Sequence, residues 1–122
     1  MRVGNDIVEI KRVENLYAKT GIPEKIFTPD EIAHIKASGS DERIVERMAG
    51  KFASKEAVSK ALGYGINEGI NWLDIEVLAD NRGMPIVTLK GKSKEIFEKN
   101  FKEISVSVAH SKDLAIATCI LI

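Results

Sequence analysis

The feature that most constrains the fold is one long helical segment in the middle of the chain. Asp41 is a favourable residue to begin a helix, and Gly63 is favourable just after a last turn, so we predict a helix that ends at Leu62. At about 100° per residue, its apolar side chains share one face. This apolar stripe consists of Ile44, Val45, Met48, Ala49, Phe52 and Ala53. A helix of this length has to bury its stripe against the rest of the fold.

Shorter elements are predicted on both sides of this helix. Thr28, Pro29 and Glu31 form a capping-box pattern, which starts a helix that runs to about Ala37. Other helices are expected over residues 11–20 and 92–100, and strands over residues 2–8, 72–79, 85–89, 104–109 and the apolar C-terminal end. Helices followed by strands indicate an α+β fold with one domain, residues 1–122, in which a small, mostly antiparallel sheet packs against the long helix and the shorter helices.

The charge balance narrows the possible partners. Lys and Arg together number 18, as do Asp and Glu, so the net charge is zero. A neutral chain is a poor general binder of nucleic acid, and any anionic ligand must be met by a local cluster of cations. No apolar run is long enough to span a membrane, and the first residues lack a signal-peptide pattern. With its single Cys119, the chain is expected to be a cytoplasmic protein that contacts neither membrane nor nucleic acid.

Glu56 is the first candidate for a functional residue. It falls inside the apolar stripe, one turn beyond Phe52. Burying an unpaired carboxylate is prohibitive, so Glu56 must be paired, protonated or bound to a cation. Lys60 lies four residues further along the helix and offers the simplest pairing. From the pattern alone, a Glu56–Lys60 ion pair and a metal site are about equally plausible.

A row of basic residues lies beside the stripe. Arg43, Arg47, Lys51 and Lys55 are spaced four apart and form an edge about 18 Å long, with no acidic residue within the row. Such rows are usually solvated. A basic row beside a carboxylate is also a suitable surface for phosphates, with the acid reserved for a metal, and Arg43, Arg47 and Lys51 then bind a phosphate-rich cofactor.

The positions of three further polar residues, Asp6, His110 and His34, in the predicted strands and helices indicate what roles they can have. Asp6 lies within a predicted strand, where Asp is disfavoured, so it is either an edge residue or a ligand. Together, Asp6 and Glu56 supply the oxygen ligands that Mg²⁺ prefers. His110 ends an alternating strand at a polar loop, which is either a plain hairpin or a phosphate-binding loop. His34 lies in a polar helical stretch and is expected at the surface.

Nearly the whole chain resembles the short bacterial holo-[acyl-carrier-protein] synthase type of the 4'-phosphopantetheinyl transferase family. The similar segments are residues 4–10 (GNDIVEI), 27–31 (FTPDE), 49–63 (AGKFASKEAVSKALG), 74–77 (DIEV), 83–85 (GMP) and 105–111 (SVSVAHS). The FASKEA core with Asp6 near the start is the most specific combination. The resemblance implies a phosphopantetheinyl transferase-like α+β fold.

The resemblance also implies an activity. Family members move the phosphopantetheine arm of coenzyme A to a serine of apo acyl carrier protein and release adenosine 3',5'-bisphosphate. The resemblance further implies dependence on Mg²⁺ and a homotrimer whose active sites lie between subunits. Candidate general bases are His110, Glu56 and a metal-polarised water, and the sequence does not choose between them.

Site residues carried over from the family fall into groups. Asp6 and Glu56 hold magnesium, and Lys60 contacts the pyrophosphate. Residues near the coenzyme are Arg43, Ser59, Gly63, His110 and Ser111, with Gly83 and Pro85 serving the cofactor of a neighbouring subunit. Lys51 departs from the pattern because many relatives carry Arg there, and a point charge then replaces a planar, bidentate group.

Partners and competing functions follow from the same residues. Acyl carrier proteins are acidic, so the basic residues Lys11, Arg12, Lys19 and Lys25 are the candidate docking surface. A non-catalytic module that binds a nucleotide or coenzyme A is the main alternative. A purely structural oligomerisation domain is a third possibility, but it leaves Glu56 unexplained.

Overall fold

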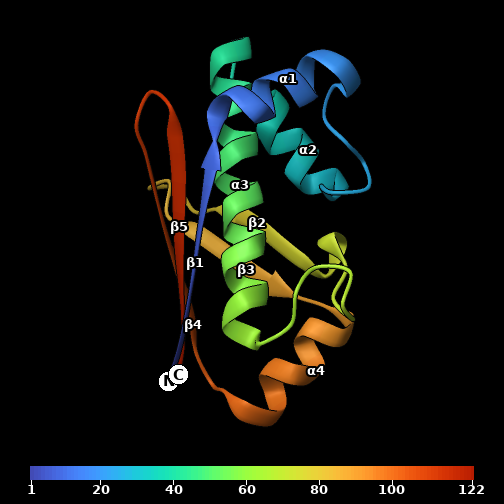
Figure 1. Ribbon diagram of the computed structural model, residues 1–122, viewed down its shortest axis with the longest axis vertical. Coiled ribbons are helices and arrows are strands. Elements are labelled where there is room, and N and C mark those ends of the chain that lie inside the picture. Colours follow the sequence, from blue (N-terminus) through green and yellow to red (C-terminus); the bar gives the residue numbers. More distant parts are fainter.

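The computed structural model describes residues 1–122 as an α+β fold (Figure 1). In chain order the elements are β1 (Arg2–Glu9), α1 (Ile10–Thr20), α2 (Pro29–Lys36), α3 (Asp41–Leu62), the 3₁₀ turn η1 (Trp72–Asp74), β2 (Ile75–Ala79), β3 (Pro85–Leu89), α4 (Gly91–Asn100), β4 (Ile104–His110) and β5 (Leu114–Leu121). Every predicted helix and strand is present, with boundaries that shift by a few residues. None of the helices combines the length and apolar character that a membrane-spanning segment requires.

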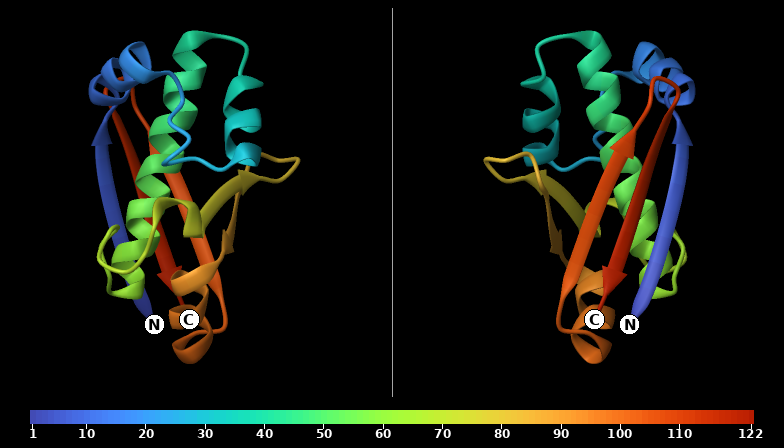
Figure 2. Two further views of the ribbon diagram at one scale, coloured as in Figure 1. Left: turned by 90° about the vertical axis from the view of Figure 1, so that its right-hand side faces the viewer. Right: turned by 90° about the vertical axis from the view of Figure 1, so that its left-hand side faces the viewer.

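All strand pairs are antiparallel, as predicted. A three-stranded sheet has the order β1-β5-β4, and β2 and β3 form a separate hairpin. Figure 2 shows α3 lying across one face of the three-stranded sheet, while the other face is left open. The hairpin and α4 lie on the opposite side of α3 from β1 (Figure 2). The long helix therefore passes through the middle of the fold and contacts the sheet, the hairpin and the other helices.

Helix boundaries follow from local capping, with two corrections. The predicted capping box of α2 is confirmed, because Thr28 accepts from Glu31 N and Glu31 reaches back to Thr28 N. For α3, the cap is Ser40 and not Asp41, since the Ser40 hydroxyl accepts from Arg43 N. The predicted strand over 72–79 begins only at Ile75. The Asp74 carboxylate accepts from Asn71 N, and Asp74 N donates to Asn71 O, so the intervening residues wind into η1.

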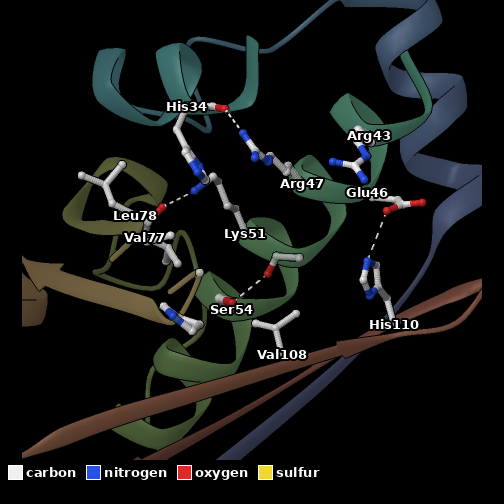
Figure 3. Close-up of a pocket in the computed structure, with 14 residues that line it drawn as sticks. His34, Arg43, Glu46, Arg47, Lys51, Ser54, Val77, Leu78, Val108 and His110 are labelled. Carbon is white, nitrogen blue, oxygen red and sulfur yellow. Dashed lines mark hydrogen bonds and ion pairs between the residues drawn. The ribbon is translucent and has the colours of Figure 1, made fainter. Parts of the chain in front are cut away.

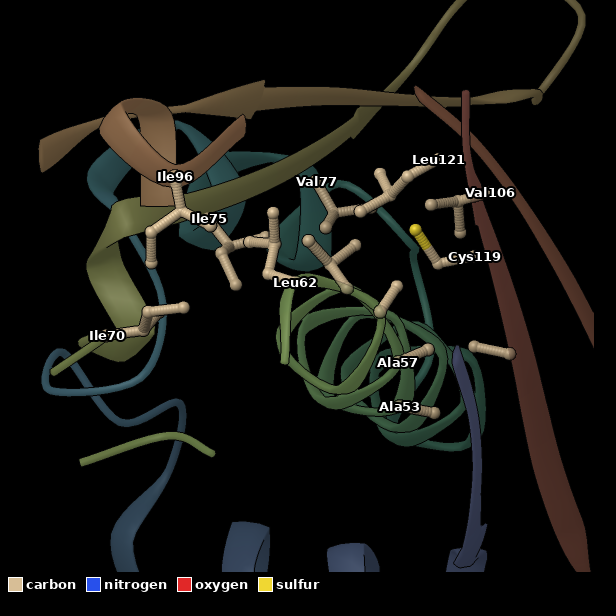
Figure 4. Packing of buried hydrophobic residues seen from close by; sticks show 13 residues of the cluster. Ala53, Ala57, Leu62, Ile70, Ile75, Val77, Ile96, Val106, Cys119 and Leu121 are labelled. Carbon is tan, nitrogen blue, oxygen red and sulfur yellow. The ribbon is translucent and has the colours of Figure 1, made fainter. Parts of the chain in front are cut away.

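The core between α3 and the sheet is built from small side chains. Ala53, Ala57 and Ala61 of α3 face Ala117 and Cys119 of β5, and none of these residues has exposed surface. On the other side of α3, larger apolar residues from the loop before η1 (Ile70), from β2 and from α4 complete the same cluster (Figure 4). Small residues allow the helix to approach the sheet closely.

Gly4 is where this approach is tightest. A Cβ atom built at Gly4 would lie 2.1 Å from Ala57 O and 2.6 Å from Ala61 N, so β1 touches the backbone of α3 at this point. Asp6, two residues further along β1, points to the same face of the sheet as Gly4. The glycine therefore brings Asp6 close to the last two turns of α3.

Replacing Gly4 by Ala should destabilise the protein. The added methyl group meets backbone atoms, which cannot rotate away, so we expect the free energy of unfolding to fall by about 3 kcal/mol, at the upper end of overpacking costs. Thermal unfolding checks this expectation. Gly69→Ala is a useful contrast, because a Cβ at Gly69 meets nothing within 4 Å and only the positive φ of 116° is strained. Equal losses in the two variants would contradict the close-packing explanation.

A buried ion pair ties three elements together. Lys55 Nζ lies 2.8 Å from Glu31 Oε1, and neither side chain has any exposed surface. Lys55 also donates to the carbonyl oxygens of Trp72 and Ile75. Glu31 accepts from the backbone N–H of Thr28 and Val77, at 2.8 Å each. The pair thus joins α2, α3 and β2, and all but one of its hydrogen bonds go to the backbone.

Candidate functional site

Two cavities flank α3, and they contain most of the predicted site residues. The first, called here the carboxylate cavity, has a volume of about 530 Å³ and contains Asp6, Glu56 and Lys60. The rest of its wall is the basic Arg12 and the apolar Ile7, Val8, Val13, Leu16, Phe27, Met48 and Phe52. It therefore presents a small charged end beside a longer apolar surface.

Lys60 pairs with Asp6 and not with Glu56. Its Nζ lies 3.0 Å from Asp6 Oδ1 and 3.1 Å from Asn5 O. The simplest interpretation of the sequence, a Glu56–Lys60 ion pair four residues apart, is thus replaced by a contact between α3 and β1. The pattern could not reveal this contact, because it depends on how closely β1 approaches the helix at Gly4.

Glu56 is half-buried and lacks an ion-pair partner. Burial raises the pKa of this carboxyl above its ordinary value, the nearby charge of Asp6 raises it further, and Lys60 opposes both effects. The expectation that Glu56 would be fully buried is wrong, because its end of the apolar stripe opens into the carboxylate cavity. A half-buried carboxyl whose pKa is raised by burial and by a neighbouring carboxylate favours a bound cation.

Asp6 and Glu56 can hold magnesium only together with oxygen ligands from outside the chain. No group of three or more His, Cys, Asp or Glu side chains gathers anywhere in the chain, so no complete metal cage is built from the protein alone. Magnesium typically takes one or two carboxylates, and phosphate oxygens and water complete its octahedron. Asp6 and Glu56 match that requirement when a phosphate ligand supplies the remaining oxygens.

The second cavity, called here the basic cavity, lies on the other side of α3. Its volume is about 380 Å³. Figure 3 shows the side chains that line it. Among its wall residues are six of the predicted cofactor contacts, Arg43, Arg47, Lys51, Gly83, Pro85 and His110. Glu46 is its one acidic residue, and its Oε2 lies 3.3 Å from His110 Nε2. Among the charged residues of the wall, cations therefore outnumber acids.

The basic row does not remain a row in the structure. Arg43 is exposed, and Arg47 donates to His34 O. Lys51 is buried and donates to Val77 O at 2.6 Å, and burial lowers its pKa to about 8. Lys55 points into the interior toward Glu31, so it is no part of a solvated or phosphate-binding edge. Helical phase could not identify this acid, because it comes from another helix.

Three predicted cofactor contacts lie outside both cavities. Ser59 has no exposed surface, and its hydroxyl donates to Glu56 O. Gly63 ends α3 in the left-handed conformation, with φ of 93°. Ser111 closes the β4–β5 turn, where its hydroxyl accepts from the N–H groups of Asp113 and Leu114. Within one chain, these residues act on the fold around the site and do not form the cavity walls.

One residue of the basic cavity was predicted to lie elsewhere. His34 was expected at the surface, yet it lines this cavity from α2. Nothing in its sequence neighbourhood distinguishes it, because its position depends on α2 packing beside α3. His34 is therefore added to the polar side chains that line the basic cavity.

Comparison with known proteins identifies the family. The family model described as "4'-phosphopantetheinyl transferase superfamily" matches residues 2–119. The chain belongs to this superfamily. Among curated members, it is similar to the holo-[acyl-carrier-protein] synthase of Thermoanaerobacter sp. (strain X514), with 40% identity over 98% of this chain and 86% of the relative. It is also similar to that of Chlorobium phaeovibrioides, with 42% identity over 99% and 94%.

Solved structures of this superfamily share the fold. The holo-(acyl-carrier-protein) synthase from Bacillus anthracis, in complex with CoA (3',5'-ADP), superposes with a TM-score of 0.81 at 37% identity, over 98% of this chain and 94% of that one. The Helicobacter pylori enzyme, in complex with coenzyme A, gives 0.80 at 34% identity, over 98% of both chains. The predicted phosphopantetheinyl transferase-like fold is thereby confirmed.

Proposed function

We propose that this chain transfers the 4'-phosphopantetheine group of coenzyme A to a serine of an apo acyl carrier protein and releases adenosine 3',5'-bisphosphate. The observation that carries the proposal is the arrangement around α3. Two carboxylates and a lysine share one cavity, and a second cavity is lined by cations, in a chain of the phosphopantetheinyl transferase superfamily. Its relatives are named for this activity, and related structures hold coenzyme A.

Asp6 and Glu56 are the proposed ligands of a magnesium ion. When bound, this ion supplies positive charge to the pyrophosphate that is cleaved. Lys60 can release Asp6 and offset negative charge on the departing bisphosphate, since its side chain is half-exposed and flexible. The apolar wall of the carboxylate cavity excludes water from one side of the reacting group. Catalysis then consists chiefly of positioning and charge stabilisation.

The two cavities support a site shared between subunits. Within one chain they lie on opposite sides of α3 and share no wall residue, so one ligand cannot occupy both. The open face of the three-stranded sheet exposes Val3, Ile7, Ile116 and Ile120, an apolar surface suited to contact with another copy. We therefore propose a homotrimer in which the carboxylate cavity of one subunit faces the basic cavity of the next. Gly83, Pro85 and His110 then serve a neighbour's coenzyme.

Intact-mass spectrometry of a carrier protein tests the proposed reaction. After incubation with coenzyme A, magnesium and this protein, an apo acyl carrier protein should gain the mass of one phosphopantetheine group. The gain should disappear when a chelator removes the metal. Binding of coenzyme A without any mass gain on a cognate carrier would instead support the non-catalytic module.

Docking of the carrier protein should depend on salt. Lys11, Arg12, Lys19 and Lys25 are all exposed on and just after α1, and Arg12 also lines the carboxylate cavity. Screening weakens attraction between such charges and an acidic partner. We expect KM for the carrier protein to rise several-fold from low to high ionic strength, with a smaller change in kcat. An unchanged KM in steady-state assays would rule out this docking surface.

A further inference from the structure

His34 has an unusual environment for a residue near the surface. Its side chain projects from α2, and the ring lies beside the end of the Lys51 side chain at the edge of the basic cavity (Figure 3). The Nδ1 atom is buried and has no hydrogen-bond partner, and it is the only buried side-chain nitrogen or oxygen in the chain of which this is true. Buried ring nitrogens nearly always find partners. The ring is therefore held in place with its hydrogen bonding incomplete.

The charges around His34 are almost all positive. From α3, Arg47 and Lys51 face the ring, and β2 presents only the apolar Val77 and Leu78. Across the cavity lie Arg43, Glu46 and His110. Burial lowers the pKa of His34 below its ordinary value, and the charges of Lys51 and Arg47 lower it further, so the ring is neutral at neutral pH.

We propose that His34 is a specificity-determining residue that recognises a phosphomonoester in the basic cavity, namely the 3'-phosphate at the nucleotide end of coenzyme A. This inference rests on the proposed function, and it adds that this end of the coenzyme lies in the basic cavity, where cations outnumber acids. It assigns a role to a side chain on α2, whereas Arg43, Arg47 and Lys51 of the cavity all belong to α3.

A phosphomonoester suits this position for two reasons. Its oxygens are the acceptors that the chain itself does not offer to the ring, and its charge of about −1.5 to −2 at pH 7 offsets the repulsion from Lys51 and Arg47. Binding should therefore raise the pKa of His34. At any pH between its values in the free and bound states, the protein takes up protons when it binds the ligand, and binding tightens as the pH falls.

Calorimetric binding of two matched ligands tests the inference. Coenzyme A and 3'-dephospho-coenzyme A differ only in the phosphomonoester, and neither assay requires a carrier protein. The variants are His34→Ala, which removes the ring, and His34→Gln, which keeps a donor but cannot titrate. Lys36→Ala is the matched control, because Lys36 is exposed on the same helix, carries a charge and lies outside the cavity wall. Thermal melts check that each variant is folded.

The expected result is selective. At pH 6.5, His34→Ala should weaken binding of coenzyme A about tenfold, as for loss of one charge-assisted hydrogen bond, and change binding of the dephospho form less than about twofold. His34→Gln should bind coenzyme A with a smaller loss. Measurements in buffers of different ionisation enthalpy should show that it takes up fewer protons than the wild-type protein. Lys36→Ala should behave like the wild type.

Other outcomes would overturn the inference. Equal weakening of both ligands by His34→Ala would indicate a general defect in the cavity, and no weakening of either would remove the role altogether. Equal proton uptake by the wild type and His34→Gln would show that the ring does not titrate on binding. Failure of phosphopantetheine transfer, with selective loss of coenzyme A binding in His34→Ala, would refute the proposed reaction while leaving this site in place.

Discussion

Replacing Glu56 by Gln should abolish most phosphopantetheine transfer and leave the fold intact. The amide keeps the size and part of the hydrogen bonding of the carboxylate but removes its charge, so the proposed magnesium site loses one of its two protein ligands. We expect kcat/KM to fall by about 10²–10³-fold or more, the size seen when one electrostatic contact to a transition state is lost. Stability should not fall, because the pKa of Glu56 is raised by burial and by Asp6, which means that its ionised form is disfavoured in the folded protein.

Two measurements on the same variant separate the possible explanations. Intact-mass assays report transfer, and thermal unfolding reports stability. Glu42→Gln is the matched control, since Glu42 is exposed on the first turn of the same helix and lies in neither the carboxylate cavity nor the basic cavity. If Glu56→Gln unfolded at a much lower temperature, or kept normal transfer, Glu56 would be a structural residue and the metal site would have to lie elsewhere.

Replacing Lys55 by Met should have the largest effect on stability. The substitution leaves the Glu31 carboxylate without its cation in a site with no exposed surface, and it leaves the carbonyl groups of Trp72 and Ile75 without a donor. Breaking a buried ion pair by removing one partner costs about 3–5 kcal/mol. Such a loss is a large part of the stability of an ordinary domain and should be plain in denaturant or thermal unfolding.

A double variant distinguishes a missing charge from a packing defect. Adding Glu31→Leu to Lys55→Met removes the unpaired carboxylate, so part of the lost stability should return. The recovery is incomplete because Glu31 also accepts from the N–H groups of Thr28 and Val77. Lys36→Met, an exposed change on α2, should alter stability by less than about 0.5 kcal/mol. A double variant less stable than Lys55→Met alone would contradict the charge explanation.

Local patterns predicted the elements of this fold well, since their causes lie within a few residues. The α3 stripe, the capping box at Thr28 and the alternation of β4 are each visible in a short window. Errors arose where two local signals compete. Ser40 and Asp41 are both good N-caps, and Trp72 to Asp74 have strand-like residues but a stronger capping pattern.

The site was less accessible to prediction, because its contacts join distant segments. Helical phase placed Glu56 inside the apolar stripe and the cations along one edge of α3, but it could not predict their burial or assign their partners. Lys55 is paired by Glu31 and Lys60 by Asp6, across separations that no periodicity records. The family resemblance supplied Asp6, and nothing supplied His34, whose position depends on the packing of α2.

Lys55 and Glu56 are neighbours in the sequence but lie about 100° apart around α3. One is anchored in the interior by the backbone of η1 and β2 and by Glu31, and the other faces Asp6 across the carboxylate cavity. The buried Lys55–Glu31 pair therefore fixes the rotation of α3 about its own axis. A rotation of α3 that moved Glu56 away from Asp6 would also break the contacts of Lys55 with its acceptors. The orientation of Glu56 toward Asp6 is in this way fixed by contacts in the protein interior and not by loops.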